Sequence, residues 1–228
     1  MNMYKGALET VTKMSLIELV YLVILLAVIL FLGRVCGNVF GNLMDFINIS
    51  PLIPFAILVL AFVGVASQMS VNSLIDPQTT PHGIISFELA KDKTRADDIM
   101  KAWGEKATSG AGGKKLIDVA QKDIKIDFAF ILCYAALMGF TCFWIAAAQE
   151  NNFVASVGLT LGWSVAIAGL LDVIENLALL RMIASGASDL LAKIAFWSAL
   201  PKLIIILYFA LPYILLIGGL TLFGLTKK

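Results

Sequence analysis

Charged side chains are scarce in this chain. Lys, Arg, Asp and Glu together make up 14% of its 228 residues, against about 25% in ordinary soluble domains. Apolar residues reach 60%, which is more than a core of this size can hide from water. The formal net charge of +1 provides no field that would attract DNA or RNA. A soluble enzyme, a disordered chain and a nucleic-acid-binding protein are therefore excluded, and the composition predicts an all-α polytopic membrane protein.

Side chains that carry catalysis or bind metals are equally few. The single histidine, His82, lies in a Pro-Gly turn with no cysteine or carboxylate at ligand spacing. Three cysteines, Cys36, Cys133 and Cys142, are too few and too scattered for a disulfide framework. No nucleophile elbow, zinc-protease motif or Walker loop is present. We therefore expect no cofactor and no metal, and the sequence favours a non-enzymatic protein without excluding an enzyme.

Five apolar stretches are long enough, or nearly so, to cross about 30 Å of hydrocarbon as helices. They are residues 15–33, 51–67, 128–148, 153–178 and 203–223. Their hydrophobicity is continuous rather than alternating, which indicates helices and not barrel strands. The sequence thus predicts a five-span bundle in three parts. Residues 1–67 hold the first two spans, 68–127 form a cytoplasmic loop with amphipathic helices, and 128–228 hold the last three spans, with a helical hairpin turning near residue 186.

Basic residues predict the orientation of these spans. If the N-terminus, the loop at 68–127 and the turn near residue 186 share one side, thirteen of the 17 Lys and Arg residues lie there and three lie opposite, with Lys202 at a span boundary. By the positive-inside rule that side is cytoplasmic, so we expect a cytoplasmic N-terminus and an external C-terminus in the plasma or inner membrane. The weakest span is 51–67. Its loss would invert the half of the chain before it.

The loop contains a short amphipathic helix. Thr94 followed by Asp97 fits a capping box, and Ile99, Met100 and Trp103 then recur on one face. A helix of about ten residues does not hold alone in water, so this face must dock. It either packs on the ends of the spans or in the lipid interface, or it receives a cytoplasmic protein or a small ligand. Acids and bases alternate around it, which is typical of a solvated face and supports an anion site only weakly.

Polar residues in the fourth span are the most informative, because each costs a few kcal/mol in hydrocarbon unless it is paired or hydrated. Asp172, Glu175 and Asn176 share one helical face at spacing i, i+3, i+4. Two interpretations stay open. The face either packs in a helical hairpin that extends past the membrane, or it lines a pocket for a cation, a proton or a polar headgroup.

The hairpin that joins the last two spans predicts a partner for this face. Gly186 is the natural end of the fourth span and Ser188 the natural cap of the next helix. Asp172 and Lys202 lie nearly equidistant from Gly186 on antiparallel helices. We therefore predict a contact between Asp172 and Lys202, with Glu175 as the alternative partner.

Small residues recur every four positions at Gly158, Gly162 and Ala166. This spacing lets a second backbone approach closely in lipid, within the subunit or between subunits. A second set, Gly33, Gly37 and Gly41, follows the first span and is weaker, because Arg34 and nearby asparagines favour an interfacial or outer helix.

Two functions are consistent with these features. The first is an oligomerising channel-like or membrane-perturbing effector, or a scaffold, whose cytoplasmic helices receive a signal or partner. The second is a small transporter or lipid-processing enzyme built around Asp172, Glu175 and Asn176. The bilayer is the expected partner in both cases, a homo-oligomer is expected in the first, and no nucleic acid is expected in either.

Overall fold

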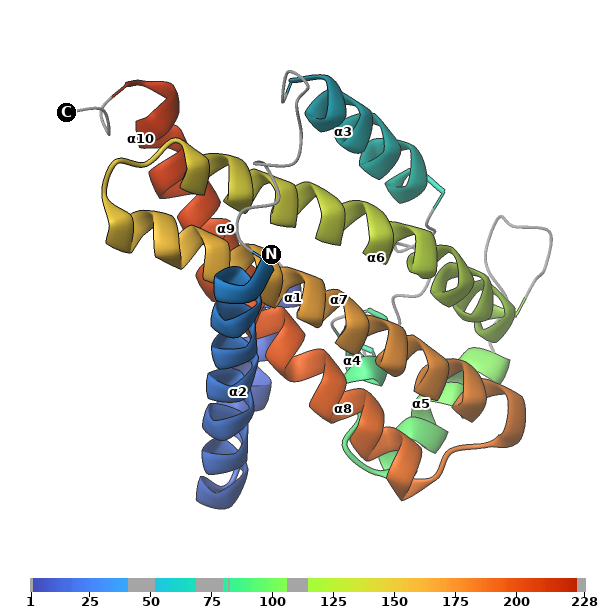
Figure 1. Ribbon diagram of the computed structural model, residues 1–228. Helices are drawn as coiled ribbons and strands as arrows, with labels where there is room; N and C mark the ends of the chain where they lie inside the picture. The colour runs from blue at the N-terminus through green and yellow to red at the C-terminus, as the bar shows by residue number, and fades with distance from the viewer. Residues whose placement is uncertain (1, 41–51, 69–79, 82, 106–114, 225–228) are drawn as a thin grey trace. The chain divides into compact units, whose positions relative to one another are not determined.

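The computed structural model describes residues 2–40, 52–68, 80–81, 83–105 and 115–224, and this part of the chain is all-helical (Figure 1). Four helices are long and apolar enough to cross a membrane. They are α2 (Leu16–Phe40), α6 (Leu116–Ala147), α7 (Asn152–Ser185) and one continuous helix from Asp189 to Leu222. The predicted all-helical class is therefore confirmed, and the four candidate spans are compatible with a multi-pass membrane protein. His82 and Gly41, singled out in the sequence, lie outside the described residues.

The predicted second span is the exception. Helix α3 (Leu52–Ala66) has 15 residues, which at 1.5 Å per residue gives about 22 Å. That is short of the roughly 30 Å of a hydrocarbon core, and α3 is an apolar helix below the length of the four candidate spans. Four candidate spans are therefore found where the sequence predicts five, and the fifth stays a prediction.

The last long helix is interrupted by two wider stretches. It runs from α8 (Asp189–Ile204) through the π-helical η3 (Ile205–Ala210), α9 (Leu211–Tyr213) and π-helical η4 (Ile214–Gly218) to α10 (Gly219–Leu222). Each π stretch follows a proline, Pro201 or Pro212. A proline withdraws one backbone N–H from the helical ladder, and a π turn is one way for the chain to reset its hydrogen bonding.

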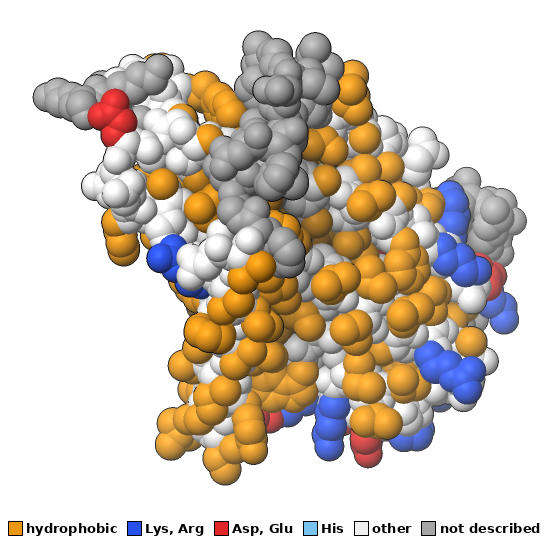
Figure 2. Space-filling model, viewed as in Figure 1, with side chains coloured by type: hydrophobic (Ala, Val, Ile, Leu, Met, Phe, Trp, Pro, Cys, Tyr) orange, Lys and Arg blue, Asp and Glu red, His pale blue; other side chains and the backbone are white. Residues whose placement is uncertain are grey.

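The chain forms two compact units that are each discontinuous in sequence. The charged unit comprises Met1–Met14, Val65–Ile131 and Leu171–Leu200, and the apolar unit comprises Ser15–Gly64, Leu132–Leu170 and Pro201–Lys228. Of the chain's 17 basic and 16 acidic residues, 26 belong to the charged unit. The apolar unit holds the other seven: Glu18, Arg34, Asp45, Glu150, Lys202, Lys227 and Lys228. Figure 2 shows hydrophobic side chains over α2 and most of the visible charged ones over elements of the charged unit.

The charged unit has a core of its own. The short helices α4 (Ile85–Glu88) and α5 (Lys93–Glu105) pack with the adjoining ends of α6, α7 and α8. The largest fully buried side chains of this core cluster are Phe87, Ile99, Trp103, Ile124, Leu179 and Met182. The Phe87 and Trp103 rings meet edge to face, with 5.3 Å between centroids. A core of this kind is typical of a domain bathed in water, where burial of apolar area is the main stabilising force.

The apolar unit exposes what a soluble protein would bury. Ile17, Val23 and Phe31 of α2 are 69%, 64% and 64% exposed. Such a surface would aggregate in water, whereas in a bilayer it contacts lipid chains at no cost. This distribution agrees with the assignment of α2 as a membrane span.

Candidate functional site

Helix α5 is fixed at its start by two carboxylates. Asp92 Oδ1 accepts a hydrogen bond from the backbone N–H of Arg95 at 2.8 Å, and Asp189 Oδ1 accepts one from the backbone N–H of Lys93 at 2.9 Å. Asp92 is therefore the cap, and the prediction that Thr94 caps this helix is wrong. The chain chooses Asp92 because its carboxylate both caps the free N–H groups and favours the positive end of the helix dipole.

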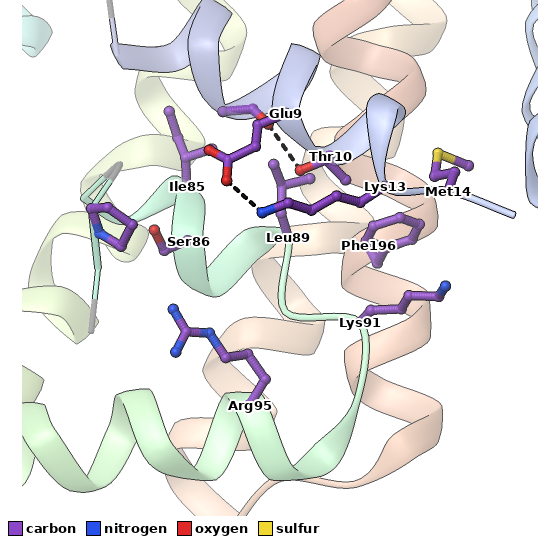
Figure 3. Close-up of a pocket in the computed structure, with 12 residues that line it drawn as sticks. Glu9, Thr10, Lys13, Met14, Ile85, Ser86, Leu89, Lys91, Arg95 and Phe196 are labelled. Carbon is purple, nitrogen blue, oxygen red and sulfur yellow. Dashed lines mark hydrogen bonds and ion pairs between the residues drawn. The ribbon is translucent and has the colours of Figure 1, made fainter. Parts of the chain in front are cut away.

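A cavity of about 300 Å³ opens in the charged unit beside this helix start. Its walls come from α1 (Asn2–Thr12) and the two residues after it, from α4 and the segment around it, from the first turn of α5, and from α8. Figure 3 shows these elements around the cavity, with Glu9 and Lys13 on one side and Arg95 on the other.

The polar part of this cavity is mainly cationic. Lys13, Lys91 and Arg95 line it, and Glu9 is the one carboxylate among the lining residues. Glu9 already pairs with Lys13, whose Nζ lies 2.5 Å from Oε1. The ammonium of Lys91 lies 5.9 Å from the centroid of the Phe196 ring, within reach of a cation–π contact. In Figure 3 the guanidinium of Arg95 is turned toward Ser86.

Neighbouring charges of the same segment are directed elsewhere. Lys93, between Lys91 and Arg95 in sequence, forms an ion pair with Asp97 one turn later on α5. The hydrogen bond and the charge of Asp97 raise the pKa of Lys93 above its usual range. The alternating charges of this segment therefore separate in the folded chain. Lys91 and Arg95 line the cavity. Asp92 accepts a backbone hydrogen bond, and Lys93 pairs with Asp97.

The three polar residues of α7 are buried in the charged unit. Asp172, Glu175 and Asn176 are 4%, 0% and 2% exposed. Asn176 Nδ2 donates a hydrogen bond of 2.7 Å to Asp127 Oδ2 of α6. Neither of the two described cavities is lined by any of these three residues. Asn176 thus contacts α6, and the two interpretations of this face, a packed hairpin and a pocket, both stay predictions.

The hairpin itself forms as its sequence indicates. Gly186 has a left-handed φ of +88° directly after α7, and its N–H bonds the carbonyl of Met182 at 2.9 Å. Ser188 Oγ accepts a hydrogen bond from the N–H of Leu191 at 3.2 Å and caps α8. Lys202, like Asp172, is buried, at 6% exposure. The contact predicted between these two residues stays a prediction.

Gly158 and Gly162 of α7 pack closely against side chains of the apolar unit. A Cβ at Gly158 would lie 2.3 Å from the hydroxyl of Tyr213, and one at Gly162 would lie 2.5 Å from the ring of Phe143. Ala166, the third member of the predicted row, is exposed. The reason is geometric, since positions four apart drift by about 40° per step on a helix of 3.6 residues per turn.

The weaker set of glycines has a packing role that the sequence analysis underrated. Gly33 and Gly37 are buried on α2 rather than on an interfacial helix, and α7 approaches them closely. A Cβ at Gly33 would lie 2.6 Å from the backbone oxygen of Thr160.

A second cavity, of about 340 Å³, lies in the apolar unit. It is lined mainly by apolar and aromatic side chains of α2, α7, η3 and α9, and the hydroxyl of Thr160 in its wall donates a hydrogen bond of 2.9 Å to the backbone carbonyl of Ser156. Tyr213 donates a hydrogen bond of 3.3 Å to the carbonyl of Val154. Its walls carry no charged side chain.

One local signal in the sequence was overlooked. Glu18 sits near the start of the first span, and its charge can be explained by proximity to water. In the structure Glu18 accepts hydrogen bonds from the N–H and hydroxyl of Ser15, both at 2.9 Å, in a capping box that opens α2. The Ser-x-x-Glu spacing carries that signal.

No protein-family model matches the chain, and searches of curated proteins and of solved structures give no match either. The function must therefore be argued from the residues of the two units.

Proposed function

We propose that this chain is a non-enzymatic integral membrane protein, a receiver or scaffold whose charged unit faces the cytoplasm and takes up a partner or a small ligand. The observation that carries the proposal is a second, water-type core built on helices that are much longer than a membrane crossing requires. The basic residues gathered in this unit support its cytoplasmic side by the positive-inside rule.

Helix lengths give the size of this surplus. Helices α6 and α7 have 32 and 34 residues, or about 48 and 51 Å at 1.5 Å per residue, against a hydrocarbon core of about 30 Å. The charged unit includes residues 116–131 of α6 and 171–185 of α7. Helices that only cross the membrane would not need these additional residues. They serve to support α4, α5 and the cavity.

The position of α1 bears on the topology. Residues of α1 and of α4 and α5 line one cavity within the charged unit, which supports a topology with these elements on the same side of the membrane. Such a topology has an even number of crossings between α1 and α4. Because α2 supplies one crossing, this supports α3 as the second, and we retain the five-span topology as part of the proposal.

Cysteine labelling tests this topology. In a background with Cys36, Cys133 and Cys142 replaced by Ser, we expect a membrane-impermeant maleimide to label Asp45→Cys and Lys101→Cys from opposite sides of sealed vesicles. Labelling of both from one side would contradict a crossing by α3.

Site-specific crosslinking tests the receiving role. A photo-reactive amino acid is placed in native membranes at Lys101, exposed on α5, and as a control at Glu150, exposed in the apolar unit. We expect discrete adducts from position 101 that are absent from position 150. Equal adducts from both positions, or none from either, would overturn the proposal.

A channel-like effector is the other form of this function. Its main support is the row of glycines on α7. Because Gly158 and Gly162 pack against side chains of the same chain, this row does not favour an oligomeric pore. Dye and ion flux from liposomes separates the two forms. We expect no flux, and flux together with an oligomeric mass in detergent would favour the channel-like form.

A further inference from the structure

We propose that the cavity of the apolar unit holds an acyl chain of a membrane phospholipid, and that Arg34 binds the phosphate of the same lipid. This site belongs to the apolar unit alone and is independent of the receiving role proposed above. The two proposals share only the assignment of α2 and α7 as membrane spans.

The walls of this cavity suit a hydrocarbon chain. They surround about 340 Å³ and carry no charged side chain, and this volume lies within the range of ligand sites. Two of its hydroxyls bond to the protein backbone, since Thr160 donates to the carbonyl of Ser156 and Tyr213 donates to that of Val154. Apolar walls of this kind exclude water and take apolar guests.

The cavity opens toward a surface that lipid contacts. Tyr208 and Phe209 of η3 line it and are 36% and 40% exposed. On the helices beside this opening, Phe31 of α2 and Leu211 of α9 are exposed as well. In a bilayer, the material next to such an opening consists of acyl chains. An unfilled space deprives its walls of dispersion contacts, so a chain that enters restores them.

Arg34 is the polar part of the proposed site. It follows Leu30, which lines the cavity, by one helical turn, so the two side chains share a face of α2. Arg34 is exposed, and among the described residues no ion pair engages its guanidinium. A guanidinium presents paired N–H donors that match two oxygens of a phosphate. A lipid whose chain fills the cavity therefore has a phosphate ligand close by.

The position of Arg34 along α2 fits the level of lipid phosphates. The helix begins at Leu16, where Ser15 and Glu18 form its capping box. Arg34 lies about 27 Å further along at 1.5 Å per residue, close to the hydrocarbon thickness of about 30 Å. With the start of α2 at one membrane surface, Arg34 reaches the phosphates of the opposite leaflet.

Helix α7 places the cavity in the same leaflet as Arg34. The end of α7 that begins at Asn152 belongs to the apolar unit. The first residue of α7 that lines the cavity, Ser156, lies about 6 Å after this end, and Leu30 lies about 6 Å before Arg34 on α2. Both helices therefore set the cavity just below the headgroups, at the depth of the acyl chains. One lipid can occupy the cavity and contact Arg34.

Photo-labelling of the full chain tests the proposal. The protein is purified in maltoside micelles, which carry no phosphate. It is irradiated with phosphatidylglycerol that bears a diazirine in one acyl chain, or with diacylglycerol that has the same chains. We expect adducts on the peptides at residues 156–161 and 208–213. Phosphatidylglycerol should give about tenfold more of them, because the charge-assisted bond to Arg34 requires a phosphate.

Two matched pairs of variants locate the site. Arg34→Gln should reduce labelling by phosphatidylglycerol to the level of diacylglycerol. Arg181→Gln, at an exposed arginine of the charged unit, should change it less than about twofold. Val157→Phe should lower labelling by both lipids, because the added ring fills the space of the chain. Val23→Phe, the same substitution at a side chain of α2 that is 64% exposed, should leave labelling unchanged.

Three results would overturn the proposal. Labelling spread evenly over the apolar surface would show ordinary lipid contact. Equal labelling of the wild-type chain by the two lipids would show that the phosphate contributes nothing. A photo-reactive amino acid at Tyr208, irradiated in the presence of phosphatidylglycerol, should form an adduct with the lipid, and an adduct with a second chain would assign the cavity to another copy of the protein.

Two controls keep the result interpretable. If the thermal midpoint of Val157→Phe in lipid-free micelles is lowered, Ser156→Leu in the same wall replaces it. Absence of the lipid adducts, with Asp45→Cys and Lys101→Cys still labelled from opposite sides, would remove the lipid site and leave the five-span topology. Specific lipid adducts, with both cysteines labelled from one side, would keep the site and remove that topology.

Discussion

The two units of this chain solve the packing problem in opposite ways. In the charged unit, large side chains such as Phe87, Trp103 and Met182 fill the space between short helices and helix ends. In the apolar unit, glycines let helices meet, as at Gly33 and Gly162, and the buried cluster of Cys142, Ile145, Leu161 and Tyr213 is small. In water, burying a bulky apolar group stabilises the fold directly. In lipid, the surroundings are already apolar, so only close contact and hydrogen bonding distinguish the packed state.

Polar side chains form hydrogen bonds in both units. In the charged unit, Asn176 reaches across from α7 to the carboxylate of Asp127 on α6. In the apolar unit, Thr141 and Ser164 return their hydroxyls to the carbonyl four residues earlier on the same helix. Backbone carbonyls are the acceptors that every membrane helix carries with it. The apolar unit also holds contacts between helices, from Gln149 to Thr221 at 2.8 Å and from Tyr213 to the carbonyl of Val154 at 3.3 Å, so local and long-range hydrogen bonds occur together there.

The largest expected effect comes from the core of the charged unit. Trp103→Ala removes a fully buried side chain and should lower the free energy of unfolding by about 3–5 kcal/mol. Leu132→Ala, in a side chain that is 72% exposed on α6, should change it little, because lipid or detergent is contacted before and after. Thermal unfolding in detergent measures both. A comparable loss from Leu132→Ala would show that this surface is a packed interface and would break the comparison.

Close helix contact in the apolar unit should come next. Gly33→Ala places a Cβ 2.3 Å from Ser164 Oγ and 2.6 Å from the Thr160 carbonyl oxygen, and the backbone oxygen cannot rotate away. We expect a loss of about 1–3 kcal/mol. At Gly64 of α3 no heavy atom lies within 4 Å of the added Cβ, so Gly64→Ala should be neutral or slightly stabilising. The same unfolding assay compares them, and equal losses would argue against close packing as the cause.

The hydrogen bond between Asp127 and Asn176 offers a smaller effect. In a double-mutant cycle with Asp127→Ala and Asn176→Ala, we expect a coupling of about 1 kcal/mol, because Asp127 is only half-buried. Strictly additive losses in the thermal stability of the two single variants and the double variant would show that the bond contributes nothing measurable.

The smallest effect should come from the exposed pair on α5. Asp97 raises the pKa of Lys93 in the folded chain, so the pair stabilises the fold below the ordinary lysine pKa of about 10.4 and this contribution is lost as the pH rises past the raised value. Lys93→Met should leave the thermal midpoint near neutral pH almost unchanged and should flatten its fall at alkaline pH. A fall just as steep in the variant would remove this pair as its cause.

Local chemistry made part of the fold predictable. Gly186 and Ser188 specify a turn whatever surrounds them, and the length of the apolar runs specifies helices for a membrane. The capping box of Ser15 and Glu18 was equally local and could have been recognised. The cap formed by Asp92 is local as well, because it accepts the N–H of Arg95 three residues later. The bond from the N–H of Lys93 to Asp189 could not be predicted, because 96 residues separate the two in the chain.

The cavity lay beyond the reach of the sequence for a different reason. Lys13 stands far along the chain from Lys91, Arg95 and Phe196, and only the fold makes them neighbours. Alternating charges gave no sign that the acids would be used as caps and pairs. The burial of Asp172 and Glu175 followed from helix phase, but the same phase fits a pocket and a packed face equally well, so the pattern alone left both open.

The charged unit is assembled from three separate stretches of chain, so it can fold only late in the synthesis of the protein. Its core joins Phe87 and Trp103 to Ala192 and Ala195, so it cannot close until α8 has left the ribosome. By then α6 and α7 have already been made, and they lack the contacts with α8 that will later brace their ends in this core. A nascent chain of this protein therefore passes through a stage in which α5 has emerged with its Trp103 face uncovered, and any chaperone that attends its synthesis has that interval in which to act.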